Sequence, residues 1–172
     1  ALAAGNCVVL KPAEQTPATI MLWADLIADL LPPGVLNIVN GFGLEAGKPL
    51  ASNPRIAKIA FTGETTTGRL IMQYASQNLI PVTLELGGKS ANIVLDDADL
   101  AKAVGGSVAG LMINSGQSCN AGTRMFVPAA KHDEALAIAA AAANKTKAGD
   151  PFAEGTNIGP VVNKTQFDKI QA

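Results

Sequence analysis

The sequence predicts an α/β fold, in which a parallel sheet of βα units is followed by a second α/β segment. Short β-branched runs alternate with segments whose apolar residues recur at helical spacing. Apolar residues make up 48% of the 172 residues and charged residues only 16%, which is typical of a globular chain. The pair Gly87-Gly88 interrupts the alternation and marks an expected boundary between residues 1–87 and residues 88–172.

The first part alternates between expected strands and expected helices. Four β-branched runs are expected to be strands, at 7–11, 35–39, 58–62 and 81–86. Helical spacing predicts helices over 16–31, 44–51 and 63–77. Thr16 is a candidate cap of the first helix, and Pro17 occupies its first position, where no backbone N–H is needed. Strands connected by helices in this way favour a parallel sheet.

The second part continues the α/β pattern. Its expected elements are a strand at 90–95, a helix at 98–113, a strand at 123–127, a helix at 131–147 and a loop at 148–160. Asp96, Asp97 and Asp99 lie near the positive end of the first of these helices, where negative charge is favourable.

Composition and charge exclude several classes of function. The net charge of −1 gives no reason to expect a nucleic-acid partner, and no apolar run has the length of a membrane span. One histidine and two distant cysteines form no metal-ligand cluster, so we expect no metal site. Two cysteines are also too few for a disulfide framework, so a reducing, cytoplasmic compartment is expected.

Polar groups follow several of the expected strands. Lys11, Thr62 with Gly63, and Glu85 each lie at or near the carboxyl end of a strand, which is where open parallel sheets bind ligands. Cys119 lies in NSGQSCNAG, among small and polar residues, whereas Cys7 opens an apolar run. This setting makes a reactive thiol at Cys119 a candidate, but the residues alone leave open the commoner alternative of a buried inert thiol.

Four motifs together resemble one family. KPAEQTP at 11–17, FTGETTTG at 61–68, LELGGKS at 84–90 and NSGQSCNAG at 114–122 occur in the order and spacing of NAD(P)-dependent aldehyde dehydrogenases. The resemblance runs through the chain and covers roughly the middle third of such an enzyme. It implies a Rossmann-like fold for residues 1–87, as part of an NAD(P)-binding domain. Residues 88–172 would be the start of an α/β catalytic domain.

The resemblance implies a covalent mechanism for oxidation of an aldehyde to a carboxylic acid. Cys119 matches the nucleophile, which forms a thiohemiacetal and, after hydride transfer to the nicotinamide, a thioester. Glu85 matches the general base that activates water for hydrolysis of the thioester. Transfer of the acyl group to coenzyme A is an alternative, which Glu85 disfavours. A non-catalytic dehydrogenase-like protein is another, which the presence of both residues disfavours.

The resemblance also implies a set of cofactor-binding residues. Lys11 and Glu14 match the groups that hold the adenosine ribose hydroxyls, and a carboxylate there favours NAD over NADP, although NADP remains possible. The other matching positions are Gly43 and Gly47 at the adenine, Thr62, Gly63 and Gly68 at the pyrophosphate, Gly87, and Gln166 and Lys169 toward the far ribose.

Some features depart from the family pattern or lie outside the chain. Glu64 stands where many relatives carry serine, and a carboxylate there would repel a diphosphate unless it turns away. The chain begins without methionine and stops inside an expected helix, so we expect a fragment that is weakly active or inactive alone. The full-length enzyme would be a homodimer or homotetramer acting on a small aldehyde. The nearest substrate-contact candidates are Leu111, Ser118 and Asn120.

Overall fold

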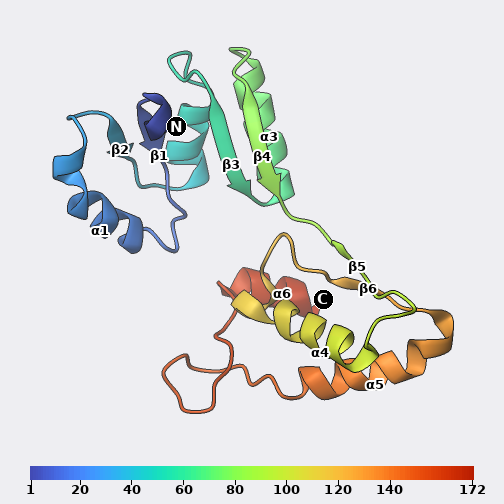
Figure 1. The fold of residues 1–172 in the computed structure, drawn as a ribbon. Coiled ribbons are helices and arrows are strands. Elements are labelled where there is room, and N and C mark those ends of the chain that lie inside the picture. Colours follow the sequence, from blue (N-terminus) through green and yellow to red (C-terminus); the bar gives the residue numbers. More distant parts are fainter. The chain divides into compact units, whose positions relative to one another are not determined.

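The computed structural model describes all residues from 1 to 172, and these form two compact units. The first unit is Ala1–Glu85 and the second is Leu86–Ala172 (Figure 1). The division lies two residues before the expected boundary at Gly87. The assignment of the two parts to cofactor binding and to catalysis stays a prediction.

The first unit opens with a parallel pair of strands joined through a helix. Strand β1 (Val8–Leu10) pairs with β2 (Leu36–Ile38), with Val8 opposite Leu36 and Leu10 opposite Ile38. Between them, α1 (Ala18–Leu26) ends five residues earlier than the expected helix 16–31. A short 3₁₀ helix, η2 (Ala28–Leu30), follows because Ile27 leaves the helical region, and the prolines at 32 and 33 cannot continue a helix.

A wide helical turn then leads into the next βαβ unit. The π-helical turn η3 (Gly43–Gly47) continues as α2 (Lys48–Ala51), in agreement with the helix expected at 44–51. Pro49 has no backbone N–H, so an α-helical hydrogen bond from that position is impossible and the wider turn is tolerated.

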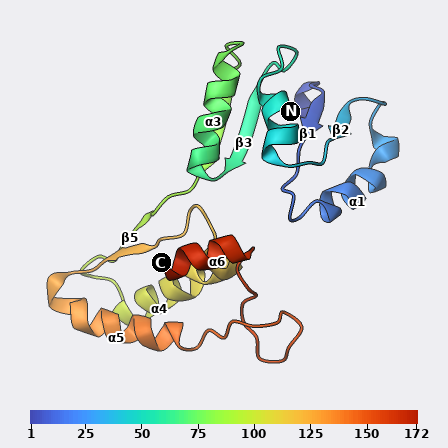
Figure 2. The same cartoon turned by 180° about the vertical axis from the view of Figure 1, so that it is seen from behind.

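Strands β3 (Ile59–Gly63) and β4 (Val82–Leu86) are hydrogen-bonded neighbours, and α3 (Thr65–Ser76) connects them. Figure 1 shows α3 beside this pair, with the two strand arrows pointing the same way, and Figure 2 shows α3 beside β3. The expected parallel sheet is thus present as two separate pairs, because no ladder within the chain joins β1–β2 to β3–β4.

The second unit packs two helices on a short parallel pair. Strand β5 (Ala91–Ile93) pairs with β6 (Arg124–Phe126), and α4 (Leu100–Leu111) and α5 (His132–Ala143) lie against each other. The Asp99 side chain caps α4 by accepting from Lys102 N at 3.1 Å. The short 3₁₀ helices η4 (Ile113–Gly116) and η5 (Ala129–Lys131) and the terminal helix α6 (Lys164–Gln171) complete the unit.

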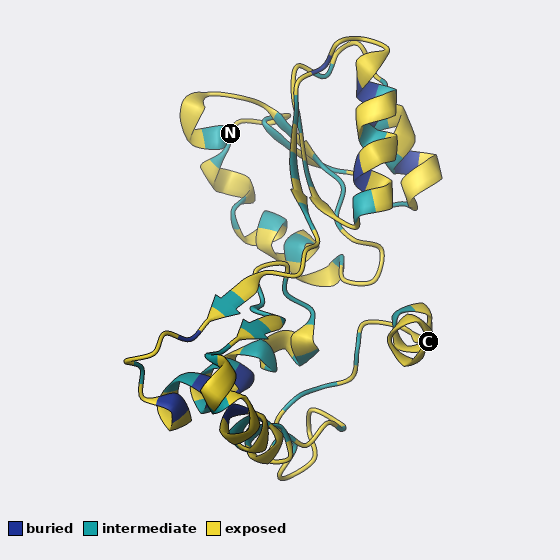
Figure 3. Ribbon diagram, turned by 90° about the vertical axis from the view of Figure 1, so that its right-hand side faces the viewer, coloured by how far each residue is buried: buried dark blue, intermediate teal, exposed yellow.

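Little of the chain is buried, as the prevalence of yellow in Figure 3 shows. The accessible surface is 12150 Å², whereas two independent domains of half this mass would expose about 9,500 Å² by the usual scaling. Part of the additional accessible surface comes from exposed apolar side chains. On α1, for example, Leu22 and Leu26 are 62% and 75% exposed. None of the helices combines the length and the apolar character that a membrane span requires.

Candidate functional site

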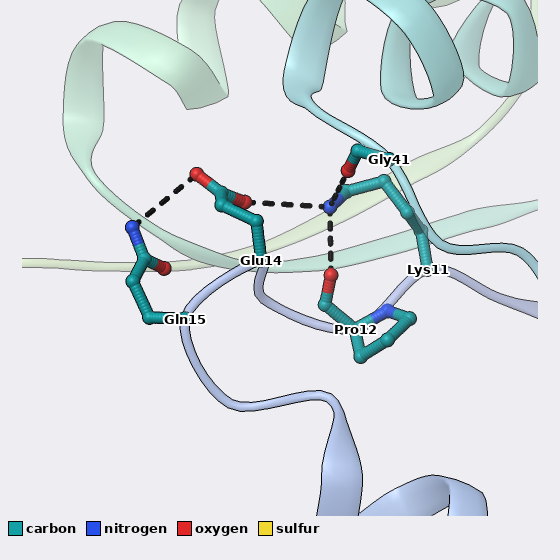
Figure 4. A network of polar contacts seen from close by, with 5 residues as sticks. All are labelled: Lys11, Pro12, Glu14, Gln15 and Gly41. Carbon is teal, nitrogen blue, oxygen red and sulfur yellow. Dashed lines mark hydrogen bonds and ion pairs between the residues drawn. The ribbon is translucent and has the colours of Figure 1, made fainter.

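The Lys11 ammonium group is held at the end of β1 by two backbone carbonyls. Its Nζ donates to Pro12 O at 2.7 Å and to Gly41 O at 3.0 Å (Figure 4). The same Nζ lies 3.6 Å from Glu14 Oε2. These contacts join the loop after β1 to the segment after β2, so the parallel pairing of the two strands determines where the Lys11 side chain ends.

Glu14 keeps its carboxylate accessible beside this ammonium group. Its side chain is 40% exposed, against 20% for Lys11, and Glu14 Oε1 accepts from Gln15 Nε2 at 3.4 Å. A partly exposed ion pair of this kind contributes little to stability, so ligand hydroxyls can replace its contacts at small cost. A cationic donor next to a carboxylate acceptor suits a pair of neighbouring hydroxyl groups.

Glycines lie close to the Lys11–Glu14 pair, and we call this region the Lys11–Glu14 corner. Gly41 has φ of +148°, and a Cβ there would lie 3.0 Å from Ala46 Cβ, so only glycine fits without rearrangement. A Cβ on Gly47 would lie 3.8 Å from Lys11 Cδ, whereas one on Gly43 would meet open space. The structure thus brings Gly47 next to the Lys11 side chain. Gly41 was not among the predicted site residues.

The end of β3 forms a second group of predicted cofactor positions. Thr62 and Gly63 are exposed and Gly68, on α3, is buried. Glu64 is the N-cap residue of α3, and its Oε2 accepts from Thr66 N at 2.7 Å and from Thr67 N at 3.1 Å. The carboxylate therefore turns toward the helix and occupies backbone donors that would otherwise face solvent or a ligand.

Glu85 and Cys119 belong to different units of the structure. Glu85 is exposed on β4, the last strand of the first unit, and Gly87 has open space at its Cβ position. Within the second unit, a Cβ on Gly88 would lie 3.9 Å from the backbone oxygen of Cys119. The Gly-Gly segment therefore passes beside the turn that carries the cysteine.

Cys119 lies on an exposed turn, so its thiol is not buried within this chain, and its reactivity stays a prediction. Ala121 N donates to Ser118 O at 3.1 Å and closes this turn around Cys119. Asn120 is exposed and Ser118 is half-buried. Cys7 is also exposed, in spite of the apolar run that it opens, so exposure alone does not distinguish the two thiols.

The residues before this turn adopt an uncommon conformation. Asn114, Ser115 and Gly116 have φ values of 55°, 57° and 73°, a left-handed run that costs free energy at non-glycine positions. Ser115 Oγ donates to Gly159 O at 2.8 Å, and Gln117 Oε1 accepts from Val162 N at 3.0 Å. Neither side chain was a predicted site residue, since no local pattern in the sequence indicates partners more than forty positions away.

A groove of the second unit lies beside Ser115 and Gln117 and not at the cysteine. It has a volume of about 660 Å³, and Met112, Ser115, Gln117 and Pro160 are among its lining residues. Cys119 is not among them. The Cys119 thiol is therefore carried by the exposed turn and does not line this groove.

Two further predicted cofactor residues lie on α6. The half-buried Gln166 follows the N-cap Asn163, whose Oδ1 accepts from Gln166 N at 2.9 Å, and Lys169 is exposed one turn later. They belong to the second unit, whereas Lys11 and Glu14 belong to the first, so their role in cofactor binding stays a prediction. No group of three or more His, Cys, Asp or Glu side chains is arranged to hold a metal ion.

Comparisons with known proteins show which family this chain is similar to. The profile of the Aldehyde dehydrogenase family matches residues 1–172. An aldehyde dehydrogenase of Paracoccus denitrificans is 60% identical over 99% of this chain and 34% of its own length. Acetaldehyde dehydrogenase 2 of Cupriavidus necator is 57% identical over 99% of the chain and 35% of its own length. The chain thus spans about a third of the curated relatives that it matches.

A solved structure extends the agreement to the backbone. A crystal structure of aldehyde dehydrogenase C from Pseudomonas syringae, in complex with NAD⁺ and octanal, matches with a TM-score of 0.94 and 47% identity. The match covers 99% of this chain and 35% of that one. The resemblance carried by the four sequence motifs is confirmed, and so is the expected α/β fold. The chain belongs to the aldehyde dehydrogenase family.

Proposed function

We propose that the protein containing this chain oxidises small aldehydes to carboxylic acids with NAD as the cofactor, and that Cys119 is the nucleophile. The observation that carries the proposal is the exposed Cys119 turn in a chain that matches the family along its whole length. Because the chain spans about a third of its relatives, the activity belongs to the complete protein.

The corner at Lys11 and Glu14 fits the adenosine end of NAD. Its accessible carboxylate and its ammonium group match the acceptor and donor that a ribose diol requires, and Gly43 and Gly47 leave room for a flat ring. Thr62, Gly63, Gly68, Gly87, Gln166 and Lys169 are proposed as further contacts. The Pseudomonas syringae relative contains NAD⁺, and bound NAD supplies the acceptor for the hydride that leaves the substrate. NADP stays a possible alternative.

The chemical steps that we assign to the chain start at sulfur. The Cys119 thiolate forms a carbon–sulfur bond with the aldehyde carbonyl, whose π electrons move to the oxygen and give a thiohemiacetal oxyanion. Backbone N–H groups of the turn are candidate donors to that oxyanion. Loss of hydride from the same carbon leaves a thioester. Ser118, Asn120 and Leu111 are the proposed neighbours of the aldehyde.

Glu85 completes the cycle as general base. Its carboxylate takes a proton from water, and the resulting hydroxide attacks the thioester carbonyl. The carbon–sulfur bond then breaks, the carboxylic acid leaves and the thiolate returns. Assembly as a homodimer or homotetramer, a cytoplasmic location and inactivity of the isolated chain stay predictions.

The test combines thiol labelling with product analysis in the full-length protein. In a Cys7→Ser background, iodoacetamide should label Cys119, an aldehyde should slow the labelling, and complete labelling should abolish NADH formation from acetaldehyde and octanal. Mass spectrometry should identify the free acid as product, also when coenzyme A is present. Acyl-coenzyme A as the main product would favour the acyl-transfer alternative, and full activity of the alkylated protein would rule out Cys119 as nucleophile.

A further inference from the structure

We infer that Glu64 weakens cofactor binding, because its carboxylate occupies the backbone donors at the start of α3 that the pyrophosphate of NAD would use. The inference rests on the proposed function, since it assumes that the protein binds NAD. It concerns a residue of this chain that departs from the serine common in the family, and it makes Glu64 a determinant of cofactor affinity.

The contacts of Glu64 resemble those of a bound anion. A single oxygen, Oε2, accepts from both Thr66 N and Thr67 N, at 2.7 Å and 3.1 Å. These N–H groups are among the first of a twelve-residue helix and have no partner within the helix. A negative charge at this end is favourable because the helix dipole places partial positive charge there. The carboxylate therefore fills the position that a phosphate oxygen would take.

The two residues that precede Glu64 are exposed to solvent. These are Thr62 and Gly63, and the Phe61 ring lies against Gly63, with its Cζ 2.5 Å from where a Cβ would stand. A solved relative whose backbone matches nearly the whole chain, α3 included, contains NAD⁺. The Glu64 carboxylate is an obstacle to a diphosphate at this turn, because it occupies the backbone donors of Thr66 and Thr67 and repels negative charge.

Two consequences follow for binding. A pyrophosphate must either displace the carboxylate from Thr66 N and Thr67 N or bind without these two donors. In both cases the affinity for the cofactor is lower. The adenosine part is unaffected, because its candidate contacts at Lys11 and Glu14 lie on other elements. Glu64 should therefore weaken ligands that carry a diphosphate and leave adenosine unchanged.

The experiment measures dissociation constants by calorimetry for adenosine, ADP and NAD, with the full-length protein and its Glu64→Ser and Glu64→Gln variants. Serine caps the helix without charge, so ADP and NAD should bind about tenfold more tightly, as expected for removal of one competing charge-assisted contact. Glutamine keeps an acceptor of the same length without the charge, so its gain should be smaller. Adenosine should bind equally to all three proteins.

Asp99→Ser is the matched control, because Asp99 caps α4 in the same manner in the second unit. It should leave all three dissociation constants unchanged. Unaltered ADP binding in both Glu64 variants, or an equal gain for adenosine, would overturn the inference and leave the proposed function in place. A parent protein that binds neither NAD nor ADP would overturn both.

Discussion

The two units of the chain bury their apolar residues in different ways. In the second unit, Val94, Leu100, Val104 and Ala135 form one contiguous core beneath the β5–β6 pair. In the first unit, the buried hydrophobic residues are Ala46, Ala51, Ala75 and Ile80, mostly small side chains that belong to no common cluster. The predicted nucleophile thus belongs to a packed unit, whereas most predicted cofactor contacts belong to a unit with open apolar faces. Binding of NAD and the reaction at Cys119 should therefore respond separately to substitution.

Substitution of the nucleophile should have the largest effect. Cys119→Ala in the full-length protein should lower kcat for aldehyde oxidation by about a thousandfold or more, because no carbon–sulfur bond can form. The dissociation constant of NAD should change by less than about twofold, since its main candidate contacts lie in the other unit. Cys7→Ala is the control and should keep the activity. A variant that lost NAD binding together with turnover would contradict the separation of the two units.

The difference in packing can be tested with two valines. Val104 is fully buried in α4, whereas Val9 on β1 is 42% exposed. Val104→Ala should lower the free energy of unfolding of the 172-residue chain by about 2 kcal/mol, because it leaves a cavity. Val9→Ala should cost less than about 0.5 kcal/mol, as is usual for exposed positions. Urea denaturation measures both, and equal losses would show that the β1 face is as well packed as the α4 core.

Much of the fold could be predicted from local patterns. The β-branched runs gave the six strands and helical spacing gave the main helices, because both depend on neighbours within a few residues. The helix ends were predicted less well. The helix expected at 131–147 ends at Ala143, where a turn through Asn144 and Lys145 leads to the bridge between Ala148 and Ile158. That bridge is a tertiary contact, which the local sequence does not indicate.

The candidate site shows the same limit. Lys11, Glu14 and Cys119 could be selected because their motifs are local. Ser115 and Gln117 were missed, because their partners Gly159 and Val162 lie in a different loop. The left-handed backbone at Ser115 carries no signal either, since serine is not a residue that favours this conformation.

The preference for NAD over NADP should depend on the negative charge of Glu14, in the first unit. A carboxylate at the 2′-hydroxyl repels the 2′-phosphate of NADP, so Glu14→Gln should raise the affinity for NADP relative to NAD by about tenfold. Fluorescence titration with both cofactors measures this ratio. Glu154→Gln, which removes an exposed carboxylate from the second unit, is the control and should leave the ratio unchanged. A ratio that stays constant in Glu14→Gln would place the adenosine ribose elsewhere.

The smallest effect is expected for substitution of Gln117, whose side chain holds the residues before the Cys119 turn. Gln117 Oε1 accepts from Val162 N, and Gln117 Nε2 donates to Asn114 O at 3.2 Å, so this one side chain ties the left-handed run to the 159–162 segment. Gln117→Ala removes both contacts, each with a net contribution of about 1 kcal/mol. We expect a decrease of about fivefold in kcat, because the cysteine is less well oriented, and an unchanged dissociation constant for NAD.

The control for this anchor is Gln73→Ala, which shortens an exposed glutamine on α3. Stopped-flow measurement of iodoacetamide labelling distinguishes orientation from stability. If Gln117 orients the thiol, labelling of Cys119 should change in Gln117→Ala at temperatures where the fold is intact by circular dichroism, and labelling of Cys7 should not. If the labelling rates of both thiols change together, Gln117 stabilises the fold as a whole. That result would contradict a specific role of Gln117 in orienting Cys119.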